Sequence, residues 1–204
     1  MESTLRKKSL FSGIWITCAW GICVLVGLFI LIRYQNKPAS VTERVSQWPV
    51  ESALLRNDSP ALVMTLHPHC PCSRASLIEL EKLLLRSSEP VQSIVLVYAP
   101  VDAEENWSGG LSLQMAEELA NVQLIRDSNG EISKTFGLRT SGETVLYSVD
   151  GELLFSGGIT ASRGHIGANA GSATVFKLLA NQKTEFRSTP VFGCAITTAT
   201  EDGM

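Results

Sequence analysis

Short apolar runs alternate with amphipathic stretches from residue 59 to residue 181, and this pattern predicts the elements of one domain. Apolar, β-branched runs of about four to eight residues predict buried strands, and leucines at helical spacing predict helices. The expected strands cover residues 61–66, 91–99, 122–126, 145–149 and 152–156, and the expected helices cover residues 75–85, 111–120, 131–136 and 173–181. A further short helix is expected within residues 47–56. Strands that alternate with helices and end in a hairpin predict an α/β sandwich with a mixed sheet.

An uncharged apolar stretch occupies residues 11–32. Its length, roughly 22 residues, is what a helix needs to cross a hydrocarbon core of about 30 Å. A cleavable signal peptide usually has a shorter apolar core followed by small residues, whereas a polar and basic segment follows here, so we expect a retained anchor. The basic cluster at residues 6–8 favours residues 1–10 in the cytoplasm and the remainder outside it. Residues 33–58 are expected to be a linker and an edge segment.

The part of the chain after the apolar stretch is acidic. Removing the four Lys/Arg and one Asp/Glu of residues 1–33 from the totals of 17 and 20 leaves 13 and 19, a net charge of about −6. Such a surface repels phosphate backbones, so no nucleic-acid partner is expected.

Five cysteines fall into two groups. Cys18 and Cys23 lie in the apolar stretch, where we expect them to act as small apolar residues. Cys70, Cys72 and Cys194 lie in the part that we expect outside the cytoplasm. Three thiols cannot all pair within one chain in an oxidising compartment, so one of them is free, bound to metal or exchanging.

Cys70 stands where the strand predicted at residues 61–66 gives way to the helix predicted at residues 75–85. Unpaired backbone N–H groups and the positive end of the helix dipole favour a thiolate at such a position. A thiolate is the form of cysteine that attacks disulfides or binds soft metals. We therefore expect Cys70 to be acidic and reachable by solvent.

Three sequence motifs together resemble the thioredoxin-fold family, and within it the bacterial RedB-like proteins near the TlpA-like and peroxiredoxin-like thiol–disulfide proteins. They are HPHCPCSRASLIEL at residues 67–80, the block at residues 136–169 and TPVFGC at residues 189–194. The resemblance implies a thioredoxin-like three-layer sandwich over residues 59–183, followed by a tail, residues 184–204, that bears Cys194. It also implies a periplasmic thiol–disulfide protein. We therefore expect residues 11–32 to hold the domain to the bacterial inner membrane and a protein thiol or disulfide to be its client.

Two positions depart from the pattern of this family. Aligning His69 and Cys70 with the usual Trp-Cys pair puts Ser73 at the position of the second cysteine, while Cys72 stands one residue earlier and gives C-x-C. Gly142 occupies the position at which the family carries a cis-proline.

The first hypothesis is a thiol–disulfide oxidoreductase that needs no cofactor, with Cys70 as the nucleophile and Cys72 as the resolving thiol. An imidazolium beside the nucleophile would stabilise its thiolate, and a proline would hold the bend before the helix. The residues expected to support the site are His69, Pro71, Ser73, Arg74, Gly142 and Cys194, the last being a second resolving thiol if the tail folds over the site. The glycine-rich loop, residues 157–171, is expected to lie beside it.

Two other functions remain open. One is a copper- or zinc-binding metallochaperone, or a cytochrome or oxidase assembly factor, because thiols and imidazoles suit these metals. Its candidate ligands are Cys70, Cys72, His67, His69, His165 and Cys194. The other is a non-catalytic binding module that uses the fold as a scaffold.

Overall fold

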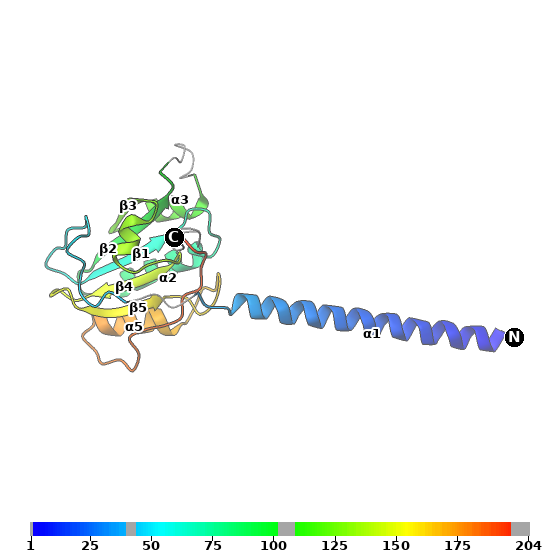
Figure 1. Ribbon diagram of the computed structural model, residues 1–204. Coiled ribbons are helices and arrows are strands. Elements are labelled where there is room, and N and C mark those ends of the chain that lie inside the picture. The colour runs from blue at the N-terminus through cyan, green and yellow to red at the C-terminus, as the bar shows by residue number, and fades with distance from the viewer. Residues whose placement is uncertain (1, 40–43, 102–108, 197–204) are drawn as a thin grey trace. The chain divides into compact units, whose positions relative to one another are not determined.

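The structure is a computed structural model, and it describes residues 2–39, 44–101 and 109–196. The chain divides into two compact units, residues 1–37 and residues 38–204. The first unit is the helix α1 (Glu2–Gln35). Within it, Trp15–Gln35 is long and apolar enough to cross a membrane, with a mean hydropathy of 2.5. By length and composition this helix fits the span predicted at residues 11–32 (Figure 1).

The second unit is built on a five-stranded mixed sheet with the strand order β3-β2-β1-β4-β5. The strands are β1 (Ala61–Leu66), β2 (Gln92–Ala99), β3 (Val122–Ser128), β4 (Glu143–Tyr147) and β5 (Leu153–Gly158). The central strand β1 pairs in parallel with β2 and antiparallel with β4, and β3 and β5 are the outer strands. The five predicted strands and the mixed sheet are confirmed.

Helices cover both faces of the sheet and complete a three-layer sandwich. They are α2 (Ser73–Arg86), α3 (Leu111–Glu117), α4 (Glu131–Thr135) and α5 (Ala170–Leu179). Successive side chains of a strand point to opposite faces, so Leu62, Met64 and Leu66 of β1 join the leucines of α2 in one core cluster. Val63 of β1 belongs to a second cluster on the other face, together with Phe136 after α4. The predicted sandwich is confirmed (Figure 1).

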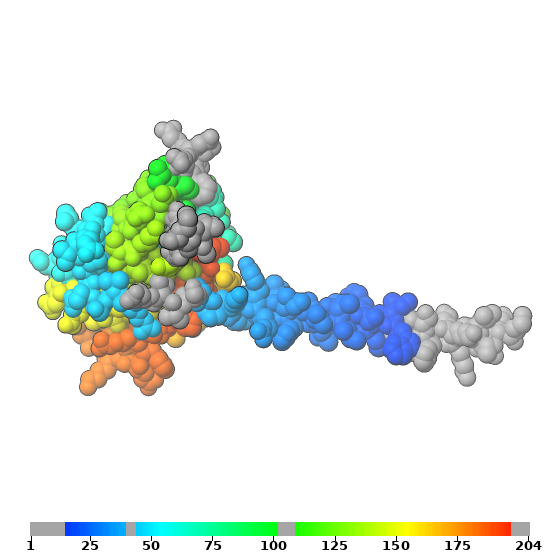
Figure 2. Space-filling model, in the orientation of Figure 1, coloured from blue at the N-terminus to red at the C-terminus, as the bar shows by residue number. Residues whose placement is uncertain are grey.

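The short helix expected within residues 47–56 is wrong, because the structure has no helix there. Gln47 instead pairs with Glu152 of the β4–β5 hairpin, and Trp48 packs edge-on against Phe136, with ring centroids 4.9 Å apart. Pairing with the hairpin holds residues 46–48 extended, and a turn follows in which the N–H of Ser52 donates to the carbonyl of Pro49 at 3.1 Å. Pro49 itself lacks the N–H that a helix interior needs. Figure 2 shows this segment (cyan) beside the region of β3 and α4 (light green).

Helix α5 begins at Ala170, three residues earlier than the sequence predicts. The side chain of Asn169 accepts a hydrogen bond from the backbone N–H of Ser172 at 2.7 Å and so caps the first turn. Gly171 therefore lies inside the helix, where a Cβ would collide with the carbonyl oxygen of Gly158. This close approach packs the start of α5 against the end of β5.

The tail runs alongside β5 before it crosses to the start of α2. Ser188 forms a parallel bridge with Ser156, and Thr189 Oγ1 donates a hydrogen bond of 2.7 Å to the carbonyl oxygen of Gly158. A Cβ on Gly157 would collide with Thr189, so glycine at this position lets the tail approach the strand. Residues 197–204 of the predicted tail lie outside the described residues.

Candidate thiol site at the start of α2

Cys70 lies in the turn that joins β1 to α2, as the sequence predicts. Its backbone N–H donates to the carbonyl oxygen of His67 at 3.0 Å, and its own carbonyl accepts from the N–H of Ser73 at 3.1 Å. Cys72 is the N-cap residue of α2, but its side chain makes no capping hydrogen bond. The backbone N–H of Cys72 hydrogen-bonds to the Cys70 sulfur. The start of the helix therefore offers a donor to the thiolate.

The loop before β4, residues 139–142, packs against the start of α2. Ser141 Oγ accepts a hydrogen bond of 2.8 Å from the backbone N–H of His67 and lies 2.7 Å from Ser73 Oγ. Both serines are buried. The Ser73 side chain also hydrogen-bonds to the Cys70 sulfur, so a chain of hydroxyls connects this sulfur with the loop.

Gly142 occupies the same loop in a left-handed conformation, with φ at +83°. Its backbone N–H donates to the carbonyl oxygen of Thr65 in β1 at 2.7 Å. A Cβ at this position would collide with Ser76 Oγ of α2. Glycine therefore permits both the positive φ and the close approach of the loop to the helix.

The tail brings a second thiol onto Cys70. Cys194 Sγ lies 2.9 Å from Cys70 Sγ, and the backbone N–H of Cys194 also hydrogen-bonds to the Cys70 sulfur. The carbonyl oxygen of Cys194 accepts from the N–H of Ser141 at 2.9 Å, and the N–H of Ile196 donates to the carbonyl of Arg139 at 2.9 Å. The tail thus folds over the site. Cys194 was expected to act as a second resolving thiol only if the tail does so.

The glycine-rich loop contributes Arg163 to the same site. Arg163 Nη1 donates a hydrogen bond of 2.6 Å to the carbonyl oxygen of Gly193, and the guanidinium also hydrogen-bonds to the Cys72 sulfur. The loop is fixed to α2 by the buried carboxylate of Glu79, which accepts from the N–H of Gly167 at 2.9 Å. The expected position of this loop beside the thiols is confirmed.

The surroundings of the three thiols separate their pKa values. Burial alone would raise the pKa of Cys70, but hydrogen bonds from Cys194, Ser73 and two backbone N–H groups outweigh it and lower the pKa below that of an ordinary cysteine. Burial and the charge of the Cys70 thiolate raise the pKa of Cys72, against the opposing charge of Arg163. Burial and the hydrogen bond to Cys70 raise the pKa of Cys194 to about 12. In the reduced site the negative charge therefore rests on Cys70.

Cys70 is only 2% exposed, so the expectation that solvent reaches its sulfur is wrong for this arrangement. Cys194 lies directly on the sulfur, and Ser112 at the start of α3 donates from its hydroxyl to the Cys70 carbonyl at 3.3 Å. Cys72 and Cys194 are both half-buried. The acidic thiol is therefore the covered one, and its neighbours face the solvent.

The metal-binding hypothesis counts three histidines among its candidate ligands. His67 stacks on Tyr98, with ring centroids 5.4 Å apart, and its pKa is lowered by burial and by the charge of His69. His165 is exposed in the glycine-rich loop. Within the part of the chain that the structure describes, no group of three or more His, Cys, Asp or Glu side chains could hold a metal ion. Binding of copper or zinc stays a prediction.

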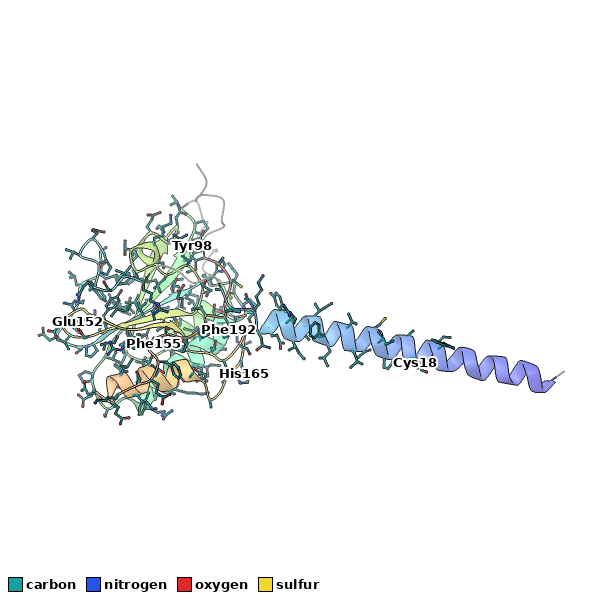
Figure 3. The ribbon with its side chains drawn as sticks, turned by 60° about the horizontal axis from the view of Figure 1, so that its bottom comes forward. Cys18, Tyr98, Glu152, Phe155, His165 and Phe192 are labelled. Carbon is teal, nitrogen blue, oxygen red and sulfur yellow. The ribbon has the colours of Figure 1, made fainter. Side chains whose placement is uncertain are left out.

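Figure 3 shows that Tyr98, His165 and Phe192 lie toward the end of the domain opposite to Glu152. This is the end at which β1 and β2 terminate and α2 begins.

The remaining predicted supporting residues lie at the edge of the site. Pro71 and Arg74 are exposed, in the turn and in the first turn of α2. The backbone N–H of His69 donates to His67 Nδ1 at 3.2 Å, and stabilisation of the thiolate by the charge of His69 stays a prediction. Sequence reasoning missed Ser141, which is 68 residues from its partner Ser73, and no spacing or periodicity in the sequence indicates that contact.

No protein-family model matches this sequence, and neither does any curated protein. The structure is similar to that of an uncharacterized conserved protein from Geobacillus kaustophilus, with 15% identity, a TM-score of 0.56, and coverage of 80% of this chain and 93% of the other. A hypothetical protein from Sinorhizobium meliloti gives 18% identity, a TM-score of 0.56, and coverage of 81% and 98%.

A secreted disulfide oxidoreductase from Mycobacterium tuberculosis matches with 14% identity, a TM-score of 0.43, and coverage of 68% of this chain and 96% of the other. Likenesses at such low identity concern the fold. The strand order of the mixed sheet, the direction of each strand pairing and the helices on both faces define a thioredoxin-like fold. The finer resemblance to RedB-like proteins stays a prediction.

Proposed function

We propose that this chain is a membrane-anchored thiol–disulfide oxidoreductase in which Cys70 is the nucleophile. The observation that carries the proposal is the contact of 2.9 Å between the Cys70 sulfur and a second thiol. Hydrogen bonds from Cys194, from Ser73 and from the backbone N–H of Cys72 outweigh burial and lower the pKa of Cys70, so its thiolate persists at a lower pH than that of a free cysteine. The thiolate is the attacking form in disulfide exchange.

The proposed reaction needs a client disulfide and two thiols of this chain. The Cys70 thiolate attacks one client sulfur, forms a mixed disulfide and releases the other client sulfur as a thiolate. A second thiol of the protein, once deprotonated, attacks the Cys70 sulfur, releases the remaining client thiolate and leaves an internal disulfide. Two electrons pass from the protein to the client, and the reverse sequence oxidises a client dithiol.

Two thiols are candidates for the second step. The C-x-C spacing favours Cys72, whose sulfur interacts with that of Cys70. The contact of 2.9 Å favours Cys194. Both leave Cys70 as the sulfur on which the mixed disulfide forms.

The length and composition of α1 support an anchor rather than a core helix. We place α1 in the bacterial inner membrane and residues 38–204 in the periplasm, where disulfides form and persist. The clients would then be proteins of that compartment that carry a reactive thiol or disulfide.

The test is a single-turnover reaction of the reduced full-length chain, in detergent, with a synthetic peptide disulfide. We expect Cys70→Ser to slow the release of peptide thiol by roughly two orders of magnitude, because serine is not ionised at neutral pH and is a far weaker nucleophile. Cys18→Ser and Cys23→Ser, in α1, are matched controls and should leave the rate unchanged. A Cys70→Ser variant that keeps the wild-type rate would contradict the proposal.

A further inference from the structure

We propose that Cys194 is the thiol that resolves mixed disulfides on Cys70, so that the tail segment, residues 187–196, is a tethered redox partner of α2. The inference rests on the proposed function, because it names the second thiol of that reaction. It assigns the internal disulfide to Cys70 and Cys194, which are 124 residues apart in the sequence.

The geometry of the two sulfurs supports this pairing. A disulfide bond is about 2.05 Å long, so Cys70 Sγ and Cys194 Sγ, which are 2.9 Å apart, need to approach by less than about 1 Å. The thiol of Cys194 already hydrogen-bonds to the Cys70 sulfur. Cys72 also hydrogen-bonds to the Cys70 sulfur, but its own sulfur accepts a hydrogen bond from the guanidinium of Arg163. Cys194 is the thiol whose sulfur approaches the nucleophile to 2.9 Å.

Contacts on both sides of Cys194 hold it in this position. On one side, Arg163 donates to the carbonyl of Gly193, and a Cβ on Gly193 would collide with the Ser141 carbonyl oxygen. On the other side, Ala195 forms an antiparallel bridge with Thr140. A thiol placed by contacts on either side meets the Cys70 sulfur in a defined orientation, which a chance contact of a loose tail would not do.

The burial of Cys70 gives the tail segment a second role. Because Cys70 is 2% exposed, a client disulfide reaches its sulfur only when Cys194 moves aside. The contacts around Cys194 are largely backbone hydrogen bonds. Ile196 is buried, but neither of the two core clusters includes a residue of the tail segment, so the segment can open without separating β1 from α2. When the segment returns, Cys194 meets the mixed disulfide at the Cys70 sulfur.

The client disulfide accepts two electrons, and the thiols of Cys70 and Cys194 supply them. The sulfur–sulfur bond of the client breaks, a bond forms between Cys70 and the client, and that bond is replaced by one between Cys70 and Cys194. Both client sulfurs leave as thiolates, and the proton of Cys194 passes to solvent or to the departing thiolate.

The first experiment maps the disulfide of the full-length chain after treatment with a mild oxidant such as diamide. Trypsin cleaves after Arg56, Arg74 and Arg187, so Cys70 and Cys72 share the peptide 57–74, whereas Cys194 lies on the peptide 188–204. We expect the two peptides to be linked in the wild type and in Cys72→Ser, and unlinked in Cys70→Ser. A peptide 57–74 that has lost two hydrogens, next to an unlinked peptide 188–204, overturns the proposal.

The second experiment follows the mixed disulfide with the peptide disulfide used above. We expect Cys194→Ser to retain at least ten times more peptide adduct on Cys70 than Cys72→Ser does under the same conditions. The opposite ratio assigns the resolving step to Cys72 and overturns the proposal, while leaving the proposed function intact.

The failure of the proposed function gives a different result. If no variant forms an adduct on Cys70 and the peptides 57–74 and 188–204 are nevertheless linked after oxidation, the pair is a structural disulfide. That outcome overturns exchange at Cys70 together with the resolving role of Cys194.

Discussion

Cys70 and Cys194 lie 2.9 Å apart, but the structure holds the two cysteines in different ways. Cys70 follows β1, whose six side chains are all buried, and precedes α2, which contributes Leu77, Leu80 and Leu83 to the largest core cluster. Cys194 lies on the tail segment, which is attached by hydrogen bonds such as those from Ser141 to Cys194 and from Arg163 to Gly193. One sulfur is fixed by the core of the domain, and the other is held against its surface.

This difference suits the two roles that we propose. A nucleophile on rigid elements keeps the donors that belong to those elements, Ser73 and the backbone N–H of Cys72, in place, so they lower its pKa whether or not Cys194 lies on the sulfur. A resolving thiol has to move away to admit the client and then return, and segments with few core contacts open at low free-energy cost. The unequal attachment of the two cysteines is therefore consistent with Cys70 as the fixed nucleophile and Cys194 as the mobile resolving thiol.

Leu80→Ala tests whether the hydrophobic core fixes α2. Leu80 is fully buried in α2, and its replacement leaves a cavity between the helix and the sheet. We expect the free energy of unfolding to fall by about 2–5 kcal/mol, measured by urea denaturation. Leu85→Ala in the same helix is the matched control, because Leu85 is 77% exposed, and it should change the free energy by no more than about 0.5 kcal/mol. Equal effects of the two variants would show that α2 is not fixed by this core.

Arg163→Gln tests whether Arg163 holds the tail segment over Cys70. It removes the charged donor to the Gly193 carbonyl at 2.6 Å. Losing a hydrogen bond from a charged group costs about 1.5 kcal/mol or more, so opening of the tail segment should become roughly tenfold more frequent. We expect alkylation of Cys70 in the reduced native protein to accelerate by that factor, while the free energy of unfolding changes far less than in Leu80→Ala. Peptide mapping after timed alkylation measures the rate.

Arg187→Gln is the matched control for this experiment. Arg187 lies in the same tail segment with an exposed side chain, so its replacement should leave the alkylation of Cys70 unchanged. If Arg163→Gln also leaves the rate unchanged, Arg163 does not hold the tail over Cys70.

The different attachment of Cys70 and Cys194 also explains which features of the site could be predicted from the sequence. The strand β1 was predicted at its observed bounds, because a short, mostly apolar run between Pro60 and His67 is typical of a buried strand. The position of Cys70 follows from that strand and from the leucine spacing of α2. Both signals are local, and both belong to the rigid side of the site.

The contacts of the tail side could not be predicted in the same way. They join residues that are distant in the sequence, as in the pairs Ser73–Ser141 and Cys70–Cys194, which are 68 and 124 residues apart. A polar side chain gives no periodic signal of which loop it will meet. For the same reason the burial of Cys70 was unexpected, since it follows from where the tail lies and not from the turn in which Cys70 stands.

The smallest expected effect is a difference in pH dependence, because the pKa values of Cys70 and Cys194 shift in opposite directions. Hydrogen bonds outweigh burial and lower the pKa of Cys70, whereas burial raises the pKa of Cys194 to about 12. Alkylation of Cys70 should therefore increase with pH and level off below the value of about 8.5 that is typical of a free cysteine, while Cys194 should still be gaining reactivity at pH 9. Mapping the alkylated peptides of the reduced protein between pH 5 and 9 measures both curves, and the same series in urea is the control, because unfolding removes both shifts. At pH 7 the thiolate fraction of Cys70 should therefore be higher in the native protein than in urea. Superimposable native and urea curves for Cys70 would show that the start of α2 and the thiol of Cys194 do not stabilise its thiolate.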